Sequence, residues 1–344
     1  AGADSGAPAR RRRLGPGRLF HELLSSALAS LLGVAPDEVA SARDEIARPD
    51  WSGYVRRLFE DAGITGMILD EGVSSSHQGQ VPAYTELTGR PFWRLARVDP
   101  LVDKLIGEGA GAAEIVRAVE YFLEDASSSG AVGFKTILAY RTGLAVDPAV
   151  GLKEAGLSLS SSGRGDEPVR HRGKALRDLV TRTVLERAAD LGRPVQIHTG
   201  FGDSELRLVE SNPLLLEDVL RSPAGSAATV VLIHGSYPWH EELAYLATVR
   251  PNVYAEMSLS NLFAPLRTPE RLGLLLELAP RDKVLAGSDG HAMPETHWFA
   301  CRLLRDGFRK LSSEMIAAGA RPAWVEATRE AVFEHNARAV YQLD

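Results

Sequence analysis

The chain has 344 residues, of which 44% are hydrophobic and 24% are charged, and its formal net charge is −6. This length suits one large α/β domain or two ordinary domains. The mild acidity excludes the basic surface that binding to nucleic acid or to an anionic membrane requires, and no apolar run approaches the roughly 20 residues of a membrane span. The single cysteine, Cys301, excludes an internal disulfide and favours a reducing compartment, so we expect a cytoplasmic protein.

The first part of the chain divides into a tail and a helical segment. Residues 1–9 are low in complexity and precede Arg10–Arg13, which is typical of a disordered basic tail, here assigned to residues 1–18. Residues 19–63 have apolar side chains at intervals of three and four, and Gly33 follows the first run. This spacing predicts helices that pack on the remainder of the chain, residues 64–344.

From Ile64 onward, short apolar runs alternate with amphipathic helical patterns such as Ala112–Ser127, His171–Leu191 and Trp324–Tyr341. Such alternation predicts an α/β fold with a parallel sheet and outer helices. Seven such units are one fewer than the eight of a (β/α)₈ TIM-like barrel. The predicted strands are Gly66–Leu69, Phe92–Val98, Val132–Ala139, Val195–His198, Val230–His234, Val253–Met257 and Val284–Gly287.

One long connection, Arg141–Val169, is polar and rich in glycine and serine. It is predicted to be a loop, and either a lid over the site or a mobile segment would account for its length.

Ionisable residues stand at the ends of several predicted strands. His198 and His234 end the fourth and fifth strands, and Asp289 follows the seventh. Because the carboxyl ends of parallel barrel strands meet on one face, these side chains are expected to converge. Imidazole and carboxylate ligands suit a divalent metal, zinc first and manganese or iron as alternatives. A bound metal acidifies water, and Asp289 is a candidate acceptor for the proton.

Two further patterns leave their interpretation open at this point. Lys135 lies inside a strand and could pair with a carboxylate, stabilise an oxyanion or, if carboxylated, bridge two metals. A Ser-His-Asp hydrolase is a weaker alternative, because the chain contains no G-x-S-x-G elbow.

Four strings carry a family resemblance: QIHTGFGD, LIHGSYPWHEELAYLATVRPNVYAEMSL, VLAGSDGHAMPE and HNARAVYQL. They resemble the amidohydrolase-related family, and within it the domains related to those fused to glutamine synthetase in fluG-like and nodulin-like proteins. The resemblance extends from about Ile64 to the end. It implies a (β/α)₈ barrel with metal-dependent hydrolysis or, in some branches, non-oxidative decarboxylation.

The resemblance also implies roles for individual residues. His198 and Asp289 match metal ligands, and Asp289 is also the proton shuttle. His234 matches a histidine that binds metal or polarises the substrate, and Lys135 matches a strand lysine near the reaction. Further residues in matching segments are implied substrate contacts, namely Tyr140, Arg141, Tyr237, His291 and Glu295.

The chain departs from the family in one respect. Members begin with a strand that ends in His-x-His, yet no such pair occurs in this sequence. We therefore expect the first barrel strand to be missing, because the chain is shortened at its amino end or because this homologue lacks the strand.

The leading expectation is a metal-dependent hydrolase of an amide or related C–N bond in a small, carboxylate-bearing substrate. The alternatives are a decarboxylase and a metal-free barrel that binds a ligand or a glutamine-synthetase-like partner without turnover. Homo-oligomerisation is left open.

Overall fold

The computed structural model describes residues 17–70, 72, 81–162, 168–291 and 293–343. The predicted basic tail lies outside these residues except for its last two positions. Glu71, which follows the first strand in the sequence, also lies outside them.

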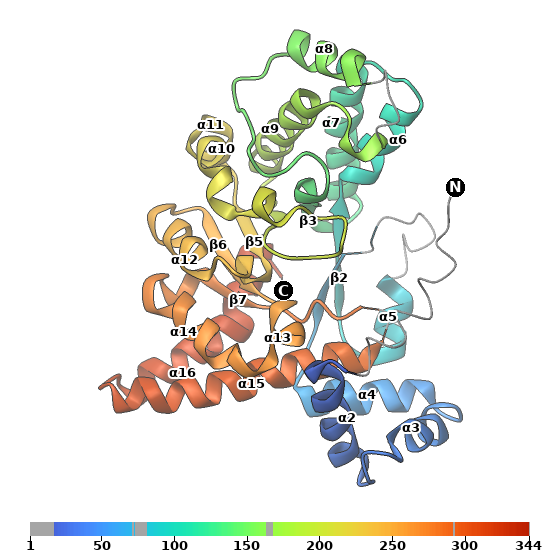
Figure 1. Cartoon of the computed structure of the whole chain (residues 1–344), viewed down its shortest axis with the longest axis vertical. Helices are drawn as coiled ribbons and strands as arrows, with labels where there is room; N and C mark the ends of the chain where they lie inside the picture. Colours follow the sequence, from blue (N-terminus) through green and yellow to red (C-terminus); the bar gives the residue numbers. More distant parts are fainter. Residues whose placement is uncertain (1–16, 71, 73–80, 163–167, 292, 344) are drawn as a thin grey trace.

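The centre of the fold is one sheet of seven parallel strands in the order β1-β2-β3-β4-β5-β6-β7 (Figure 1). Each strand pairs with the next one along the chain, as in a barrel. All seven predicted strands are present, with ends that differ by up to three residues. They are β1 (Met67–Asp70), β2 (Phe92–Arg97), β3 (Ala131–Thr136), β4 (Val195–His198), β5 (Val230–Ile233), β6 (Val253–Met257) and β7 (Val284–Ala286).

Helices connect and surround the strands. No helix of the described residues is long and apolar enough to cross a membrane. The helices are α2 (Leu19–Leu32), α3 (Val39–Ala47), α4 (Trp51–Ala62), α5 (Val81–Thr88), α6 (Asp99–Gly107), α7 (Ala112–Ser128), α8 (Leu152–Ser162), α9 (Lys174–Asp190), α10 (Glu217–Arg221), α11 (Pro223–Ala227), α12 (His240–Val249), α13 (Ser260–Phe263), α14 (Thr268–Leu278), α15 (Pro294–Ala317), α16 (Pro322–Glu330) and α17 (Asn336–Tyr341).

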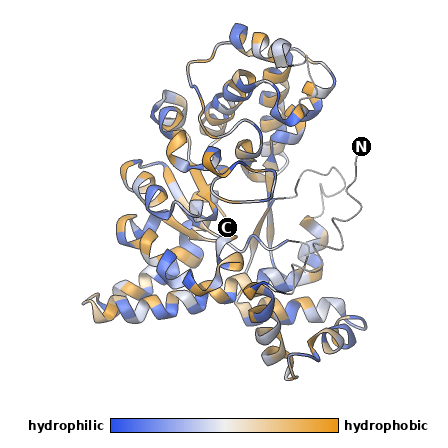
Figure 2. Ribbon diagram, in the orientation of Figure 1, coloured by the Kyte–Doolittle hydropathy of each residue, from blue (hydrophilic) through white to orange (hydrophobic). Residues whose placement is uncertain are grey.

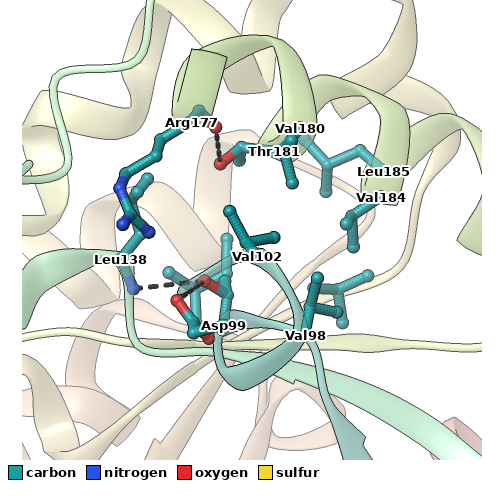
Figure 3. Close-up of a pocket in the computed structure, with 12 residues that line it drawn as sticks. Val98, Asp99, Val102, Leu138, Arg177, Val180, Thr181, Val184 and Leu185 are labelled. Atoms are coloured by element: carbon teal, nitrogen blue, oxygen red, sulfur yellow. Dashed lines mark hydrogen bonds between the residues drawn. The ribbon is translucent and has the colours of Figure 1, made fainter. Parts of the chain in front are cut away.

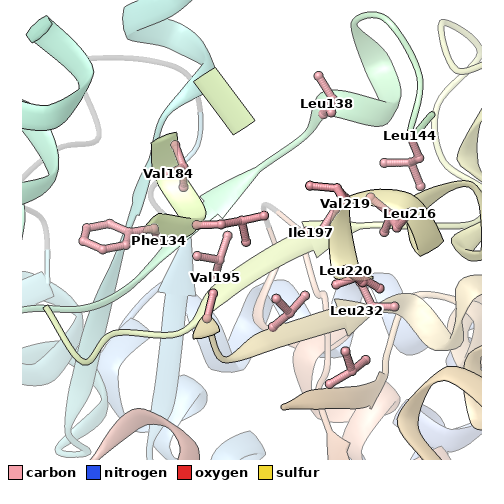
Figure 4. Packing of buried hydrophobic residues seen from close by; sticks show 14 of the residues in the cluster. Phe134, Leu138, Leu144, Val184, Val195, Ile197, Leu216, Val219, Leu220 and Leu232 are labelled. Carbon is pink, nitrogen blue, oxygen red and sulfur yellow. The ribbon is translucent and has the colours of Figure 1, made fainter. Parts of the chain in front are cut away.

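The main core lies between the strands and the outer helices. Fully buried strand residues such as Phe134, Ile197 and Leu232 pack against side chains of α9 and α10 (Figure 4). Strands covered on both sides bury nearly every residue, which is why they read in the sequence as continuous apolar runs. Figure 2 shows this as hydrophobic colouring on the central strands, with hydrophilic residues on the outer helical faces.

The helices α2, α3 and α4 form a second apolar cluster with the start of α15 (Figure 1). Trp298 of α15 is completely buried, and its Nε1 donates to Asp61 Oδ2 of α4 at 2.7 Å. Asp50 caps α4 by accepting from the Gly53 backbone N–H at 2.8 Å, which suits an N-cap carboxylate. The predicted helical segment therefore packs on the barrel through α15.

Two sequence predictions are corrected by the structure. The connection Arg141–Val169 contains the helix α8, so it is not wholly a loop. The final helix is interrupted between α16 and α17 by a π-helical turn, Ala331–His335.

A cavity of about 930 Å³ lies between the two ends of the sheet. Residues of β1 line one side and residues of β7 line the other, and in the described part of the chain no strand pairs with their outer edges. The side chains of Lys135, His234 and Asp289 also line this cavity.

Candidate functional site

The two strand-end histidines are in direct contact. His198, the last residue of β4, is in register with Ile233 of β5, which places His234 beside it. The ring centroids are 4.5 Å apart, and His198 Nδ1 lies 3.0 Å from His234 Nε2. Both side chains are buried, with 5% and 3% exposure.

The chain turns sharply after β5, and this turn sets the position of His234. His234, Gly235 and Ser236 all have positive φ, of 70°, 59° and 49°. Such left-handed residues are strained unless the surroundings hold them, and they cluster at functional sites. Thr199 fixes this turn to β4, because its Oγ1 donates to the Ile233 carbonyl at 2.8 Å and lies 2.6 Å from Ser236 Oγ.

Burial keeps both histidines neutral. Desolvation, with the charge of Lys135 adding to it, lowers the pKa of His198 to about 3. Burial, the neighbouring His198 and Lys135 also place the pKa of His234 well below its usual value. Both rings are therefore uncharged at neutral pH, with one ring nitrogen carrying a lone pair, which is the state that can bind a metal ion.

Asp289 follows β7 and faces the histidines. Its Oδ2 lies 3.9 Å from His234 Nδ1, and its φ of 43° is again in the left-handed region. The side chain keeps 37% exposure toward the cavity. Desolvation by the protein atoms around it nevertheless raises its pKa to about 6, with the charge of Lys135 opposing and that of Asp70 adding to the effect. A carboxylate with this pKa can accept a proton near neutral pH.

Lys135 belongs to an ion-pair cluster at the ends of β1, β2 and β3. Its Nζ lies 3.0 Å from Asp70 Oδ2, and Arg97, in register with Lys135 on β2, also binds the Asp70 carboxylate. Burial would raise the pKa of Asp70, but the charges of Lys135 and Arg97 lower it to about 2. Lys135 therefore pairs with a carboxylate, and the cluster leaves its ammonium beside the cavity.

The predicted substrate residues separate into two groups. Tyr140 and Tyr237 lie close to the histidines: the Tyr140 ring is 4.7 Å from that of His198, and the Tyr237 backbone N–H donates to the His234 carbonyl at 3.3 Å. His291 is exposed, two residues after Asp289, and donates its backbone N–H to Thr296 Oγ1 at 3.1 Å.

The side chains of Arg141 and Glu295 are engaged elsewhere. Arg141 pairs with Asp103 of α6 at 2.8 Å. Glu295 Oε1 accepts from Arg43 Nε at 2.7 Å and from the Tyr54 hydroxyl at 2.9 Å, which joins α15 to α3 and α4. Sequence reasoning assigned no partner to either side chain.

A small cavity near Arg177 is too small for a substrate. It holds about 20 Å³, room for one water molecule. It lies between Asp99, Val102 and the α9 side chains, including Thr181 (Figure 3). The cavity between β1 and β7, of about 930 Å³, has substrate dimensions.

The donor set of the site fits part of a metal site. His198 Nδ1 and His234 Nε2 are hydrogen-bonded to one another at 3.0 Å, a separation that two ligands of one ion can also span once that proton is lost, given bonds of about 2.0–2.1 Å from zinc to imidazole nitrogen. His198 Nε2 is buried and has no well-oriented hydrogen-bond partner among the described residues. The same part of the chain holds no group of three His, Cys, Asp or Glu side chains close enough to bind a metal together.

The fold and the site can now be compared with known proteins. A family model described as Amidohydrolase matches residues 108–343. The chain belongs to the amidohydrolase family. This family match includes Lys135, His198, His234 and Asp289.

Individual amidohydrolase relatives agree with this result. Protein fluG of Emericella nidulans is 28% identical over 365 residues, covering 96% of this chain and 41% of fluG. The chain thus spans about two fifths of the length of that relative. A candidate metal-dependent hydrolase from Lactobacillus casei ATCC 334 is similar in structure, with a TM-score of 0.84 and 26% identity over 95% of this chain and 85% of that one.

A uronate isomerase from Thermotoga maritima is similar in fold, with a TM-score of 0.68 and 14% identity over 94% of this chain and 79% of that one. The matches confirm the predicted amidohydrolase resemblance and the TIM-like barrel. The seven described strands are consistent with a barrel whose first strand is absent from the described residues.

Sequence reasoning gave no role to two features of this site. Arg97 completes the ion-pair cluster with Asp70 and Lys135. Glu256 and Ser258 were visible as polar residues on β6 and just after it, but their contact with His234 depends on the turn after β5. The available signal for the Arg97 ion pair was its position at the end of β2, beside the strand that ends in Asp70.

Proposed function

We propose that this amidohydrolase is a metal-dependent hydrolase that cleaves an amide or related C–N bond of a small substrate. The observation that carries the proposal is the pair of neutral imidazoles, His198 and His234, whose ring nitrogens face one another at 3.0 Å beside Asp289. The family match and the similarity to the Lactobacillus casei protein support it.

The proposed metal ligands are His198, His234 and Asp289, with zinc as the first choice and manganese or iron as alternatives. When bound, such an ion acidifies water and polarises a carbonyl group. Because the described residues do not bring three ligands together, Asp289 would have to move toward the histidines or a further ligand would have to join them.

The roles of the other residues follow from their positions. Asp289, whose pKa is about 6, accepts the proton of the attacking water and returns it to the departing amine. Lys135, whose ammonium lies beside the cavity, stabilises the negative charge on the carbonyl oxygen or binds a substrate carboxylate. Tyr140, Tyr237 and His291 are proposed substrate contacts.

A second candidate function is a barrel that binds a ligand or a glutamine-synthetase-like partner without turnover. The absence of a three-ligand group among the described residues favours it. A decarboxylase would use the same site on a carboxylic acid substrate, and the assay below distinguishes it through carbon dioxide release.

The test is a hydrolysis assay on N-acyl amino acids and on matched amides without the carboxylate, in zinc, in manganese and with a chelator. We expect amine release that the chelator abolishes, and a rate of release that is lower by roughly 100-fold or more in Asp289→Asn. The matched control is Asp44→Asn, because Asp44 lies on α3, is 47% exposed and does not line the cavity. Carbon dioxide release instead of amine release would favour the decarboxylase, and ligand binding without any metal-dependent turnover would favour the binding barrel.

The proposed location is the cytoplasm. Cys301, the chain's single cysteine, is a free thiol whose pKa is raised by burial to about 12. An unreactive free thiol of this kind supports a reducing compartment.

A further inference from the structure

His234 has a second hydrogen-bonded side, which faces β6. Its Nδ1 lies 2.8 Å from Ser258 Oγ, and Ser258 Oγ donates to Glu256 Oε2 at 2.8 Å. The same Glu256 oxygen accepts the backbone N–H of His234 at 3.0 Å. His234, Ser258 and Glu256 therefore form one closed ring of hydrogen bonds.

This ring is shielded from solvent. His234 is 3% exposed, Ser258 2% and Glu256 9%. The Glu256 carboxylate is also held by packing, because a Cβ on Gly287 would lie 1.8 Å from its Oε1. With little access for water, the protein partners themselves decide where each proton lies.

The proton positions can be counted from the donors. A backbone N–H can only donate, so Glu256 Oε2 acts as an acceptor toward His234. With Glu256 ionised, the single hydroxyl proton of Ser258 is donated to that same oxygen. Burial raises the pKa of Glu256 to about 7, so this arrangement is expected above that pH. Ser258 then offers only a lone pair to the imidazole, so the proton of that hydrogen bond belongs to His234 Nδ1.

The proton on His234 Nδ1 determines the state of the other ring nitrogen, Nε2, which faces the site. A neutral imidazole that carries its proton on Nδ1 has a lone pair on Nε2. His234 Nε2 is the atom that faces His198 Nδ1 at 3.0 Å. Asp289 cannot take over the role of Ser258, because its Oδ2 is 3.9 Å from His234 Nδ1, beyond hydrogen-bond distance.

We propose that Ser258 and Glu256 are positioning residues that hold His234 as the Nδ1–H tautomer and so direct its Nε2 lone pair toward His198, where it accepts from the His198 Nδ1–H at 3.0 Å in the metal-free chain. Carboxylate partners of this kind commonly orient histidines that bind metals. Only the use of that lone pair rests on the proposed function, since the tautomer is a property of the chain itself.

The direct test is nitrogen NMR of the full chain labelled with ¹⁵N-histidine, without added metal, with the His234 signals assigned by their loss in His234→Gln. We expect the Nδ1–H tautomer in the unmodified chain and in Ser258→Thr, which keeps the hydroxyl. Ser258→Ala should lose the preference. Glu256→Gln should keep it, because the amide oxygen can accept both the His234 backbone N–H and the Ser258 hydroxyl, whereas Glu256→Leu should lose it. Ser260→Ala, a fully buried serine whose hydroxyl donates to the Met257 sulfur at 3.9 Å, is the matched control and should change nothing.

A second measurement follows zinc binding in the same variants by equilibrium dialysis. Ser258→Ala should weaken it roughly 10- to 100-fold and Ser258→Thr should restore it. An Nε2–H tautomer in the unmodified chain, or an unchanged tautomer in both Ser258→Ala and Glu256→Leu, would overturn the inference. If no variant binds zinc while the tautomer responds as expected, the positioning role stands and the proposed hydrolase function fails.

Discussion

Replacing Asp70 by asparagine should destabilise the protein, because Asp70 is the carboxylate that pairs with both Lys135 and Arg97 in the ion-pair cluster described above. Burial opposes its charge, but the two cations lower its pKa from 3.8 to about 2. At about 1.4 kcal/mol per pKa unit, this difference corresponds to about 2 kcal/mol of folding free energy near neutral pH. Asp70→Asn should cost at least that much, since it also removes the carboxylate that the buried Lys135 and the half-buried Arg97 both contact.

The dependence on pH gives the sign of the effect. A carboxylate with a lowered folded-state pKa contributes stability above its unfolded pKa, near 3.8, and loses it as the pH falls through about 2. The difference in unfolding free energy between the natural chain and Asp70→Asn should therefore shrink by about 1 kcal/mol between about pH 6 and pH 3. Urea unfolding followed by circular dichroism measures both quantities.

Asp44→Asn is the matched control. Asp44 also forms ion pairs, with Arg48 at 3.2 Å and Arg43 at 3.3 Å, but its side chain is 47% exposed. Its loss should change stability by less than about 0.5 kcal/mol. Equal effects of the two substitutions, or a difference for Asp70→Asn that grows as the pH falls, would refute the reasoning.

Three other substitutions test the packing and the buried histidines. Gly200→Ala should lower the free energy of unfolding by about 2 kcal/mol or more, because φ is +74° and the new Cβ would lie 2.5 Å from the backbone of the turn after β5. Gly33→Ala is the control: its φ is +77°, but the space around it is open, so it should lower the free energy of unfolding by about 1 kcal/mol. Urea unfolding measures both values. Leu232→Ala in the core should lower the free energy of unfolding by about 2–5 kcal/mol. Leu266→Ala, at a position that is 71% exposed, should lower it by less than about 0.5 kcal/mol. Similar values for the two variants would contradict the described core. Burial lowers the pKa of His240 to about 4, so the stability contributed by its neutral ring is present above about pH 6.5 and is lost as the pH falls toward 4. His240→Gln should therefore flatten the fall of the thermal midpoint over that interval. An unchanged slope would count against a buried neutral ring.

The sequence predicted the strands well because their pattern depends on burial alone. A parallel strand covered on both faces is mostly apolar, and β4 and β6 were located to the residue although each also carries polar residues. Helix α8 was missed, since its sequence LKEAGLSLSSS is rich in serine and glycine and has weak intrinsic helix propensity. It folds there because it packs on α9, a contact that no local pattern reveals.

The candidate site could be predicted only where it depends on strand ends. His198 and His234 were expected to meet because adjacent parallel strands bring their last residues together, and the structure places them 3.0 Å apart. The partners of Arg141 and Glu295 were not predictable, because Asp103 lies 38 residues from Arg141 and Arg43 lies 252 residues from Glu295. Their roles in substrate binding remain predictions.

The central claim is that His198, His234 and Asp289 hold a divalent metal. The most direct test is a calorimetric titration of the metal-free chain with zinc. The same titration is repeated on His198→Gln, on His234→Gln and on the control His21→Gln on helix α2. The account predicts a single equivalent bound to the natural chain and to His21→Gln, with affinity reduced by at least about tenfold in each of the other two variants. No binding to the natural chain, or the same affinity in all of the variants, would contradict it.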